Sequence, residues 1–153
     1  MRLHPTVHTS IQMSFQIHQV DWATRRDDLH AVRYEVFVLG QNVPAEEEVD
    51  SMDPNCNHFL ATDSDSNPIG TARVLADGHI GRVAVLEPWR GKGVGRALML
   101  ASLDCVSKLG LTTALLDSQL TAAAFYEKLG FEQFGEEFME CGIPHIAMRK
   151  RLQ

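Results

Sequence analysis

The sequence predicts an α/β (α+β) fold for one domain. Three observations favour this class: short apolar runs separated by turn residues, one long amphipathic segment near the start, and two further helical segments in the second half. A length of 153 residues suits one domain that buries roughly two-thirds of the surface exposed by its unfolded chain. We expect residues 13–153 to form this domain and residues 1–12 to form a flexible extension.

The first half of the chain contains predicted strands and one helix. Residues 14–20 alternate apolar with polar side chains and predict a strand. Residues 24–39 follow helical spacing, with Thr24 as the expected N-cap. The apolar face of this helix consists of Leu29, Val32, Val36 and Phe37. Residues 58–62 and 69–75 flank a polar turn that contains a proline, and together they predict a hairpin.

The second half begins with a strand that leads into a helix. The tight-turn pair Asp77-Gly78 precedes an apolar run at residues 80–86, which predicts a buried strand. A helix follows, because apolar residues recur at helical spacing between Val94 and Leu109 before a glycine C-cap at Gly110. Further strands are expected at residues 111–116, 131–138 and 145–152.

Residues 90–96 (Arg-Gly-Lys-Gly-Val-Gly-Arg) join this strand to this helix and carry the strongest functional signal in the chain. Glycine has no Cβ, so the backbone can approach an anion closely, and the free N–H groups and dipole at the start of a helix favour negative charge. Positive charge is added by Arg90, Lys92 and Arg96. The pattern predicts a site for a phosphate-bearing cofactor; a tight turn without further function is the alternative.

The spacing of the glycines excludes two familiar nucleotide sites. A Walker A loop needs four residues between its first glycine and a Gly-Lys pair that is followed by Ser or Thr. A dinucleotide fingerprint needs Gly-x-Gly-x-x-Gly, whereas Gly91, Gly93 and Gly95 alternate evenly. Asp117 lies roughly where a dinucleotide fold keeps its ribose-binding acid, but such a fold opens with its glycine loop, and here a long hairpin-containing segment comes first. A dehydrogenase is therefore a distant alternative.

Residues 90–95 resemble motif A of the GNAT superfamily of acyl-CoA-dependent N-acetyltransferases, whose Arg/Gln-x-x-Gly-x-Gly/Ala corresponds to Arg90, Gly93 and Gly95. Residues 121–131 (Thr-Ala-Ala-Ala-Phe-Tyr-Glu-Lys-Leu-Gly-Phe) are similar to its motif B helix. The resemblance covers nearly the whole chain in order. The segments at residues 36–44, 70–73 and 142–145 look like those of a little-characterised bacterial branch of the superfamily. The resemblance implies a single mixed, mostly antiparallel central sheet of six to seven strands, splayed at the cofactor site and flanked by three to four helices.

The resemblance implies an N-acetyltransferase that moves an acetyl group from acetyl-CoA directly to a primary amine of a small molecule. Many relatives keep a glutamate on the strand before the glycine loop, and this strand has none. An acyl-CoA-binding sensor or assembly module without turnover is therefore the alternative. Dimers are common among such enzymes, so a homodimer stays open.

The resemblance also assigns coenzyme A to particular residues. The pantetheine arm would pair with the backbone of Val83, Ala84 and Val85, and the diphosphate would meet backbone N–H groups of the glycine loop. The expected cofactor-binding residues are Val83, Ala84, Val85, Arg90, Gly91, Lys92, Gly93, Val94, Gly95, Arg96, Gln119, Phe125 and Tyr126.

Two groups are expected to assist the transfer. The backbone N–H of Val85 is the expected oxyanion donor, by the resemblance and because a fixed donor needs no reorganisation during the reaction. Tyr126 is the expected proton donor, since a phenol with a pKa of about 10 can hydrogen-bond a thiolate whose conjugate acid has a pKa of about 8.5. Packing beside Phe125 is the alternative explanation for Tyr126.

The general base is less well defined. The strand before the glycine loop offers only His79, at its start. The other candidates are Glu48, Asp50, Asp53, His58 and His145. The acidic segment at residues 46–50 can attract a cationic acceptor, so Glu48, Asp50 and His145 are the expected substrate-side residues; a solvated loop is the alternative.

The composition of the chain argues against certain classes of binding partner. A net charge of −6 argues against nucleic acid, whose binding needs a basic patch. No apolar run approaches the length of a bilayer, so no membrane partner is expected. Cys56, Cys105 and Cys141 are odd in number and contain no Cys-x-x-Cys pair, so we expect no disulfide framework, no metal site and a cytoplasmic location.

Overall fold

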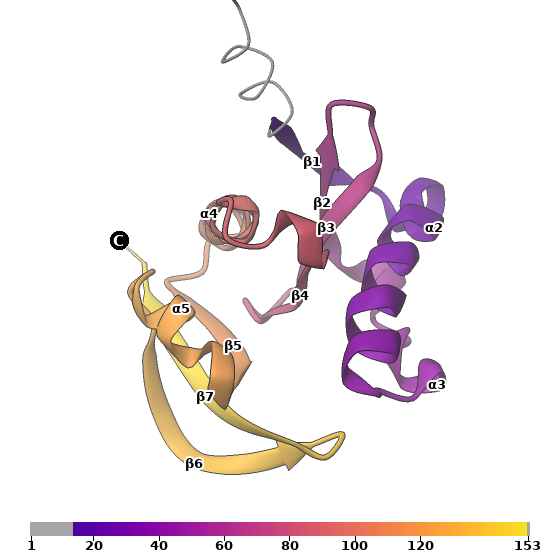
Figure 1. The fold of residues 1–153 in the computed structure, drawn as a ribbon. Helices are drawn as coiled ribbons and strands as arrows, with labels where there is room; N and C mark the ends of the chain where they lie inside the picture. The colour runs from indigo at the N-terminus through magenta and orange to yellow at the C-terminus, as the bar shows by residue number, and fades with distance from the viewer. Residues whose placement is uncertain (1–13, 153) are drawn as a thin grey trace, which may run out of the picture.

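The computed structural model describes residues 14–152, so the extension expected at residues 1–12 lies outside the described residues. Within residues 14–152, seven strands form two antiparallel sheets (Figure 1). The first sheet has the order β1-β2-β3-β4, with bounds Phe15–Val20, Asn57–Asp63, Pro68–Val74 and Ile80–Val85. The second has the order β5-β7-β6, with bounds Thr113–Gln119, Ile143–Arg151 and Glu132–Glu140. The predicted α/β class is confirmed.

The two sheets meet at one end of β4 and β5. A parallel bridge joins His79 to Leu115, and the Leu115 N–H donates to the Gly78 carbonyl at 3.0 Å. Beyond this point the two strands separate (Figure 1), and no further ladder pairing between them is present in residues 14–152. The expected splayed sheet is therefore present as two sheets joined at this bridge.

One face of the first sheet is covered by α2 (Trp22–Arg33), which continues directly into the π-helical segment η1 (Tyr34–Leu39) (Figure 1). The helix expected at residues 24–39 is thus present, although its N-cap is Asp21 and its last turns are wider than those of an α-helix. Its residues Leu29, Val32 and Val36 are buried, as their spacing predicts. The short helix α3 (Ala45–Glu48) and the 3₁₀ turn η2 (Asp53–Asn55) follow.

The opposite face is covered by α4 (Val94–Lys108), which packs against β2, β3 and β4 (Figure 1). Leu98, Met99 and Val106 of α4 are fully buried, and burial of such a side chain contributes roughly 1.5–3 kcal/mol. The same apolar cluster includes Leu116 of β5 and Met148 of β7. One core therefore supports both sheets and fixes the position of the opening between them.

The second half of the chain returns to the first through a long hairpin. After β5, η4 (Leu120–Ala122) and α5 (Ala123–Glu127) lead into the hairpin of β6 and β7, which curves toward α3 (Figure 1). At its tip, the Cys141 thiol donates to the Glu47 carboxylate of α3 at 3.3 Å. Among residues 14–152, no helix combines the length and the apolar character needed to cross a bilayer.

Candidate active site

The backbone of Val85 faces the opening between β4 and β5. The Leu86 N–H donates to the Ile69 carbonyl of β3 at 2.9 Å, so these two residues form a hydrogen-bonded pair. Gly70 and Val85 are the next pair along the ladder, and hydrogen-bonded pairs alternate with non-hydrogen-bonded pairs in antiparallel strands. The Val85 N–H and carbonyl therefore point away from β3. Arg90 agrees with this direction, because its Nε donates to the Val85 carbonyl at 2.9 Å.

A β-bulge on β4 changes the direction of the strand just before Val85. The register shifts where Thr71 pairs with Ala84 and Arg73 pairs with Gly81, and Arg82 adopts a positive φ of 50°. The Thr71 hydroxyl donates to the Arg82 carbonyl at 2.9 Å and holds this geometry. Bulges of this kind re-aim side chains. Here Ala84 packs with Val32 and Val36 on the α2 face, while Val83 and Val85 pack against the core on the α4 side.

The glycine loop leaves backbone donors free at the start of α4. Gly93 is the N-cap residue with a φ of 91°, in the left-handed region, and the helix has no side-chain cap. The Ala97 N–H donates to the Gly93 carbonyl at 3.0 Å, so the N–H groups before Ala97 in the first turn lie ahead of the helical ladder. A Cβ added to Gly91 or Gly93 would meet no atom within 4 Å. The surface of the loop is therefore open.

Gly95 has a different role from Gly93. A Cβ at Gly95 would lie 3.3 Å from Cζ of Phe125 and 3.8 Å from Cγ2 of Val85. Glycine at this position thus lets α4, β4 and α5 come together. The sequence suggested that Gly95 lacks a side chain so that an anion can approach the backbone. The structure corrects this explanation, because the missing side chain also makes room for Phe125.

The loop has the donor chemistry that a diphosphate requires. Lys92 and Arg96 are exposed next to the positive end of the α4 dipole, and the first turn of α4 contains no acidic residue. Cations at a helix N-terminus are unfavourable unless an anion lies nearby. Free N–H groups, two basic side chains and an open backbone surface therefore fit the diphosphate of coenzyme A.

Tyr126 lies on α5, the helix that meets this loop through Phe125. Its ring contacts Phe125 and Phe131 edge-on, with centroids 5.0 and 6.1 Å apart. Burial raises the pKa of Tyr126 to about 12, so its phenol stays neutral at pH 7 and keeps its proton. The structure thus shows the packing role and leaves the hydroxyl in the form that can donate.

The structure places His79 far from the opening. His79 belongs to the bridge that closes β4 onto β5, and its Nδ1 lies 2.9 Å from the Asp77 carboxylate. Six residues of strand separate it from Val85, which corresponds to on the order of 20 Å. His79 therefore cannot take a proton from an amine at the opening, which corrects its assignment as a candidate base.

His145 and Gln119 lie at the other end of the strands, where β5 and β7 pair these two residues. The Gln119 side chain donates to the Gln41 side chain at 2.8 Å, which links β5 to the segment after η1. His145 stacks on Phe138 at 5.7 Å, and its Nδ1 lies 2.7 Å from the Ile143 carbonyl. A carbonyl only accepts, so this contact assigns the proton to Nδ1 and leaves Nε2 as an acceptor in the neutral ring.

Six charged residues form a cluster between α2, α3 and the first sheet. We call it the buried charge network, and it consists of Arg33, Glu48, Asp50, Asp53, Arg73 and Arg82. Nη1 of Arg33 lies 2.9 Å from Asp53, and Nη2 of Arg73 lies 2.7 Å from Asp50. Glu48 is fully buried and contacts the Arg33 Nε. Buried charges are tolerated when they are paired in this way.

The arginines set the protonation of this network. The hydrogen bond from Arg73 lowers the pKa of Asp50 to about 2. Burial raises the pKa of Asp53, but hydrogen bonds and charges from Arg33 and Arg73 outweigh it, so the net shift is downward. His58 stacks on Trp22, and burial lowers its pKa, so it is neutral and structural.

The buried charge network corrects the prediction that Glu48 and Asp50 are substrate-side residues. Glu48 and Asp50 are bound to arginines and do not form an open acidic surface, so neither is free to attract a cationic acceptor. Asp53 is likewise fully buried and paired. The residue that sequence reasoning missed is Arg82, and its signal was an arginine within an otherwise apolar strand.

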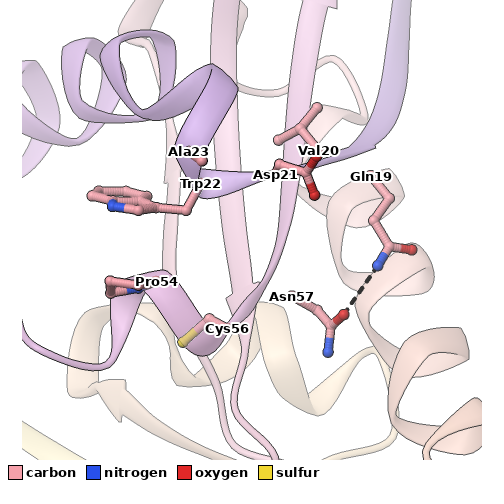
Figure 2. Close-up of a pocket in the computed structure, with 8 residues that line it drawn as sticks. All are labelled: Gln19, Val20, Asp21, Trp22, Ala23, Pro54, Cys56 and Asn57. Atoms are coloured by element: carbon pink, nitrogen blue, oxygen red, sulfur yellow. Dashed lines mark hydrogen bonds between the residues drawn. The ribbon is translucent and has the colours of Figure 1, made fainter.

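A shallow pocket of about 300 Å³ lies elsewhere, at the start of α2. Figure 2 shows its lining, where the Gln19 amide donates to the Asn57 side chain at 3.1 Å and Trp22 lies above Pro54. Burial raises the pKa of Cys56, so its thiol stays protonated. The pocket contains no group prepared for acyl transfer. The free backbone donors at Val85 and at the start of α4 instead make the opening beside β4 the candidate active site.

Comparison with known proteins agrees with this geometry. The sequence matches the family model described as the acetyltransferase (GNAT) domain over residues 25–152. The chain belongs to this family. As a GNAT protein it is an acyl-CoA-dependent N-acetyltransferase, and the expected family and fold are confirmed.

Relatives of this GNAT protein extend over most of its length. It is 39% identical over 127 residues to the uncharacterized N-acetyltransferase YjcF of Bacillus subtilis, covering 80% of this chain and 90% of that protein. The crystal structure of an acyl-CoA N-acyltransferase from Pseudomonas aeruginosa has a TM-score of 0.80 at 32% identity, covering 90% and 99% of the two chains. Escherichia coli ElaA has a TM-score of 0.78 at 29% identity, with the same coverage of 90% and 99%.

Proposed function

We propose that this GNAT acetyltransferase moves an acetyl group from acetyl-CoA directly to a primary amine of a small molecule. The observation that carries the proposal is the common direction of two sets of backbone donors. The Val85 N–H points into the opening between β4 and β5, and the free N–H groups of α4 begin where β4 ends. Acetyl-CoA would supply the acetyl group as a reactive thioester.

Different residues around the opening would bind different parts of coenzyme A. Backbone N–H groups from Gly91 to Arg96, with the side chains of Lys92 and Arg96, would hold the diphosphate. The backbone of β4 at Val83, Ala84 and Val85 would bind the pantetheine amides. Arg90 would act by fixing the start of the loop, since its Nε already holds the Val85 carbonyl. Gln119 would contact the cofactor from β5, and Phe125 would line the side opposite β4.

Three groups would assist the transfer. The Val85 N–H would donate to the oxygen that gains negative charge, as a fixed donor already aimed at the opening. Tyr126 would donate a hydrogen bond to the departing sulfur, because its raised pKa keeps the phenol protonated. An amine of the lysine type is mostly protonated at neutral pH, so a proton acceptor is also needed. We assign this role to His145, whose Nε2 is left free by the bond at Nδ1.

A thiol-release assay tests this function. Purified protein is incubated with acetyl-CoA and a panel of primary amines, and free coenzyme A is measured with a thiol reagent. Transfer predicts release that requires both protein and amine. Calorimetric titration with acetyl-CoA provides the control, because cofactor binding without release above background hydrolysis would identify a sensor and contradict the proposal.

A further inference from the structure

Arg82 differs from the other arginines of the buried charge network because its unused guanidinium nitrogen reaches solvent. In the described part of the chain, the unpaired Nε of Arg73 is buried, and every guanidinium nitrogen of Arg33 has an acceptor. The Nε of Arg82 donates to the Glu48 carbonyl at 3.0 Å, and its Nη2 donates to the Glu47 carbonyl and to Asp50, both at 3.3 Å. Within residues 14–152, Nη1 has no acceptor, and it is not among the buried polar atoms that lack a partner. The side chain is 24% exposed. Nη1 is therefore a charged donor that reaches solvent.

The carboxylates of the network are already bound to other donors. Both oxygens of Asp50 accept from Arg73, and both oxygens of Glu48 are occupied, one by Arg33 and one by His30. Burial lowers the pKa of Arg82, and the neighbouring charges of Arg73 and Arg33 lower it further. The three arginines and three carboxylates of the network balance in charge, so the open donor at Nη1, and not an excess of positive charge, is what an anion would meet.

The position of Arg82 connects this donor with the proposed reaction. Arg82 occupies the bulge of β4, three residues before Val85, and shares the α2 face with Ala84. Its Nη2 reaches α3 at Glu47, and the Glu47 side chain meets the hairpin tip at Cys141. Figure 1 shows β4, α3 and the tip of the β6–β7 hairpin around the same side of the molecule. This is the side of β4 opposite α4, and the inference requires the acceptor to approach Val85 from it.

We propose that Arg82 binds a carboxylate carried by the acceptor, so that the acceptor is an amino acid or another amine with a single acidic group. The inference rests on the proposed function. A guanidinium recognises a carboxylate through its planar N–H groups, and Nη1 with the loosely held Nη2 offers such an edge. A phosphate would bring a second negative charge close to Asp50 and Glu47, which favours the singly charged carboxylate.

The test compares acceptors that differ only in this group. Phenylalanine is matched with phenethylamine, and lysine with cadaverine, and kcat/KM is measured for each. The wild-type protein should prefer the amino acids. Arg82→Gln should lower kcat/KM for the amino acids by about ten- to a hundredfold, the range for a lost charge-assisted hydrogen bond, while the decarboxylated amines change little.

Two further variants separate recognition from folding. Arg82→Lys keeps a positive charge in the network and should retain part of the preference for amino acids. Arg149→Gln removes an exposed arginine on β7 and should leave the preference unchanged. Thermal midpoints are recorded for all variants. An equal fall for both acceptor classes in Arg82→Gln, or a wild-type preference for the decarboxylated amines, would overturn the inference.

A binding measurement distinguishes failure of this inference from failure of the proposed function. Thermal shifts are measured in the presence of coenzyme A with N-acetylphenylalanine and with N-acetylphenethylamine. Greater stabilisation by the acid, lost in Arg82→Gln, supports the carboxylate site even if no amine is acetylated. Equal stabilisation, or none by the acid, counts against the site whether or not thiol is released.

Discussion

The α2 face of β4 and the opening beside β5 handle polar groups in opposite ways. On the α2 face, the carboxylates of Glu48, Asp50 and Asp53 are paired with arginines and mostly removed from water. At the opening, the Val85 N–H points away from β3, and the first N–H groups of α4 lie ahead of the helical ladder beside an open loop surface at Gly91 and Gly93. The two regions lie within a few residues of each other along one strand.

This difference distinguishes structure from function. A buried charge is costly unless it is paired, so the pairing of these carboxylates with arginines is what a stable fold requires. Unpaired donors do not stabilise the free protein, and they are tolerated where solvent or a ligand reaches them. Arg82 combines both features, since it contributes to the network and keeps one nitrogen open.

The largest expected effect concerns the open region, through Tyr126→Phe. Removal of a group that hydrogen-bonds the departing sulfur should lower kcat by about 10²- to 10⁴-fold, with acetyl-CoA affinity and thermal stability retained. Steady-state kinetics and calorimetric titration measure the two quantities. Tyr34→Phe is the matched control, because Tyr34 is an exposed tyrosine on η1. Unchanged turnover in Tyr126→Phe would leave Tyr126 with its packing role alone.

The paired region should respond in stability instead. Arg33→Met removes the close arginine of buried Glu48 and leaves buried Asp53 with Arg73 alone, so the free energy of unfolding should fall by about 3–5 kcal/mol. Urea denaturation measures this value. Arg25→Met is the control, since Arg25 pairs with Asp28 on the surface and should contribute at most about 1 kcal/mol. If both variants lost the same small amount, the buried network would not be a source of stability.

Gly93→Ala sharpens the comparison between conformational strain and ligand binding. The left-handed φ of 91° makes a side chain unfavourable, at a cost of about 1 kcal/mol in stability. Gly110 has a similar φ of 84° and also has no neighbours within 4 Å of an added Cβ, so Gly110→Ala should cost about the same. Acetyl-CoA affinity should fall by roughly tenfold in Gly93→Ala only, because this Cβ would face the diphosphate. Equal affinities in titrations of the two variants would contradict the loop assignment.

Much of the fold could be predicted from local sequence. Apolar periodicity indicated the long helices, and Leu29, Val32 and Val36 are buried as predicted. Turn dipeptides indicated the hairpin between β2 and β3. The glycine loop could be found because its chemistry is contained in seven consecutive residues, 90–96. Its position between β4 and α4 agrees with the prediction.

Pairings between distant residues could not be predicted. Glu48 looked like part of an acidic surface because its neighbours are acidic, but Arg33 lies 15 positions before it and reaches it only in the folded chain. His79 looked suitable because it precedes β4, yet a strand carries its two ends far apart. Gly95 likewise owes its role to Phe125, a contact between two helices that the spacing of the glycines does not reveal.

The smallest expected effect is a pH dependence of the paired region. The hydrogen bond from Arg73 lowers the pKa of Asp50 from 3.8 to about 2, so on acidification the unfolded chain takes up this proton before the folded chain does. The stability contributed by the pair is therefore complete above pH of about 4 and is lost as the pH falls toward about 2. Because Asp50 is partly exposed and solvent screens its charge, we expect a loss of about 1 kcal/mol from this residue.

Asp50→Asn tests this sign directly. Asparagine does not titrate, so the variant should be less stable than wild type at neutral pH and should lose less stability between about pH 5 and pH 3. Urea unfolding at several pH values measures both slopes. Asp28→Asn, which removes a surface carboxylate outside the network, should follow the wild-type slope. A wild-type slope in Asp50→Asn would instead assign the acid sensitivity to carboxylates outside the network, and the contrast between the two regions of β4 would lose its electrostatic basis.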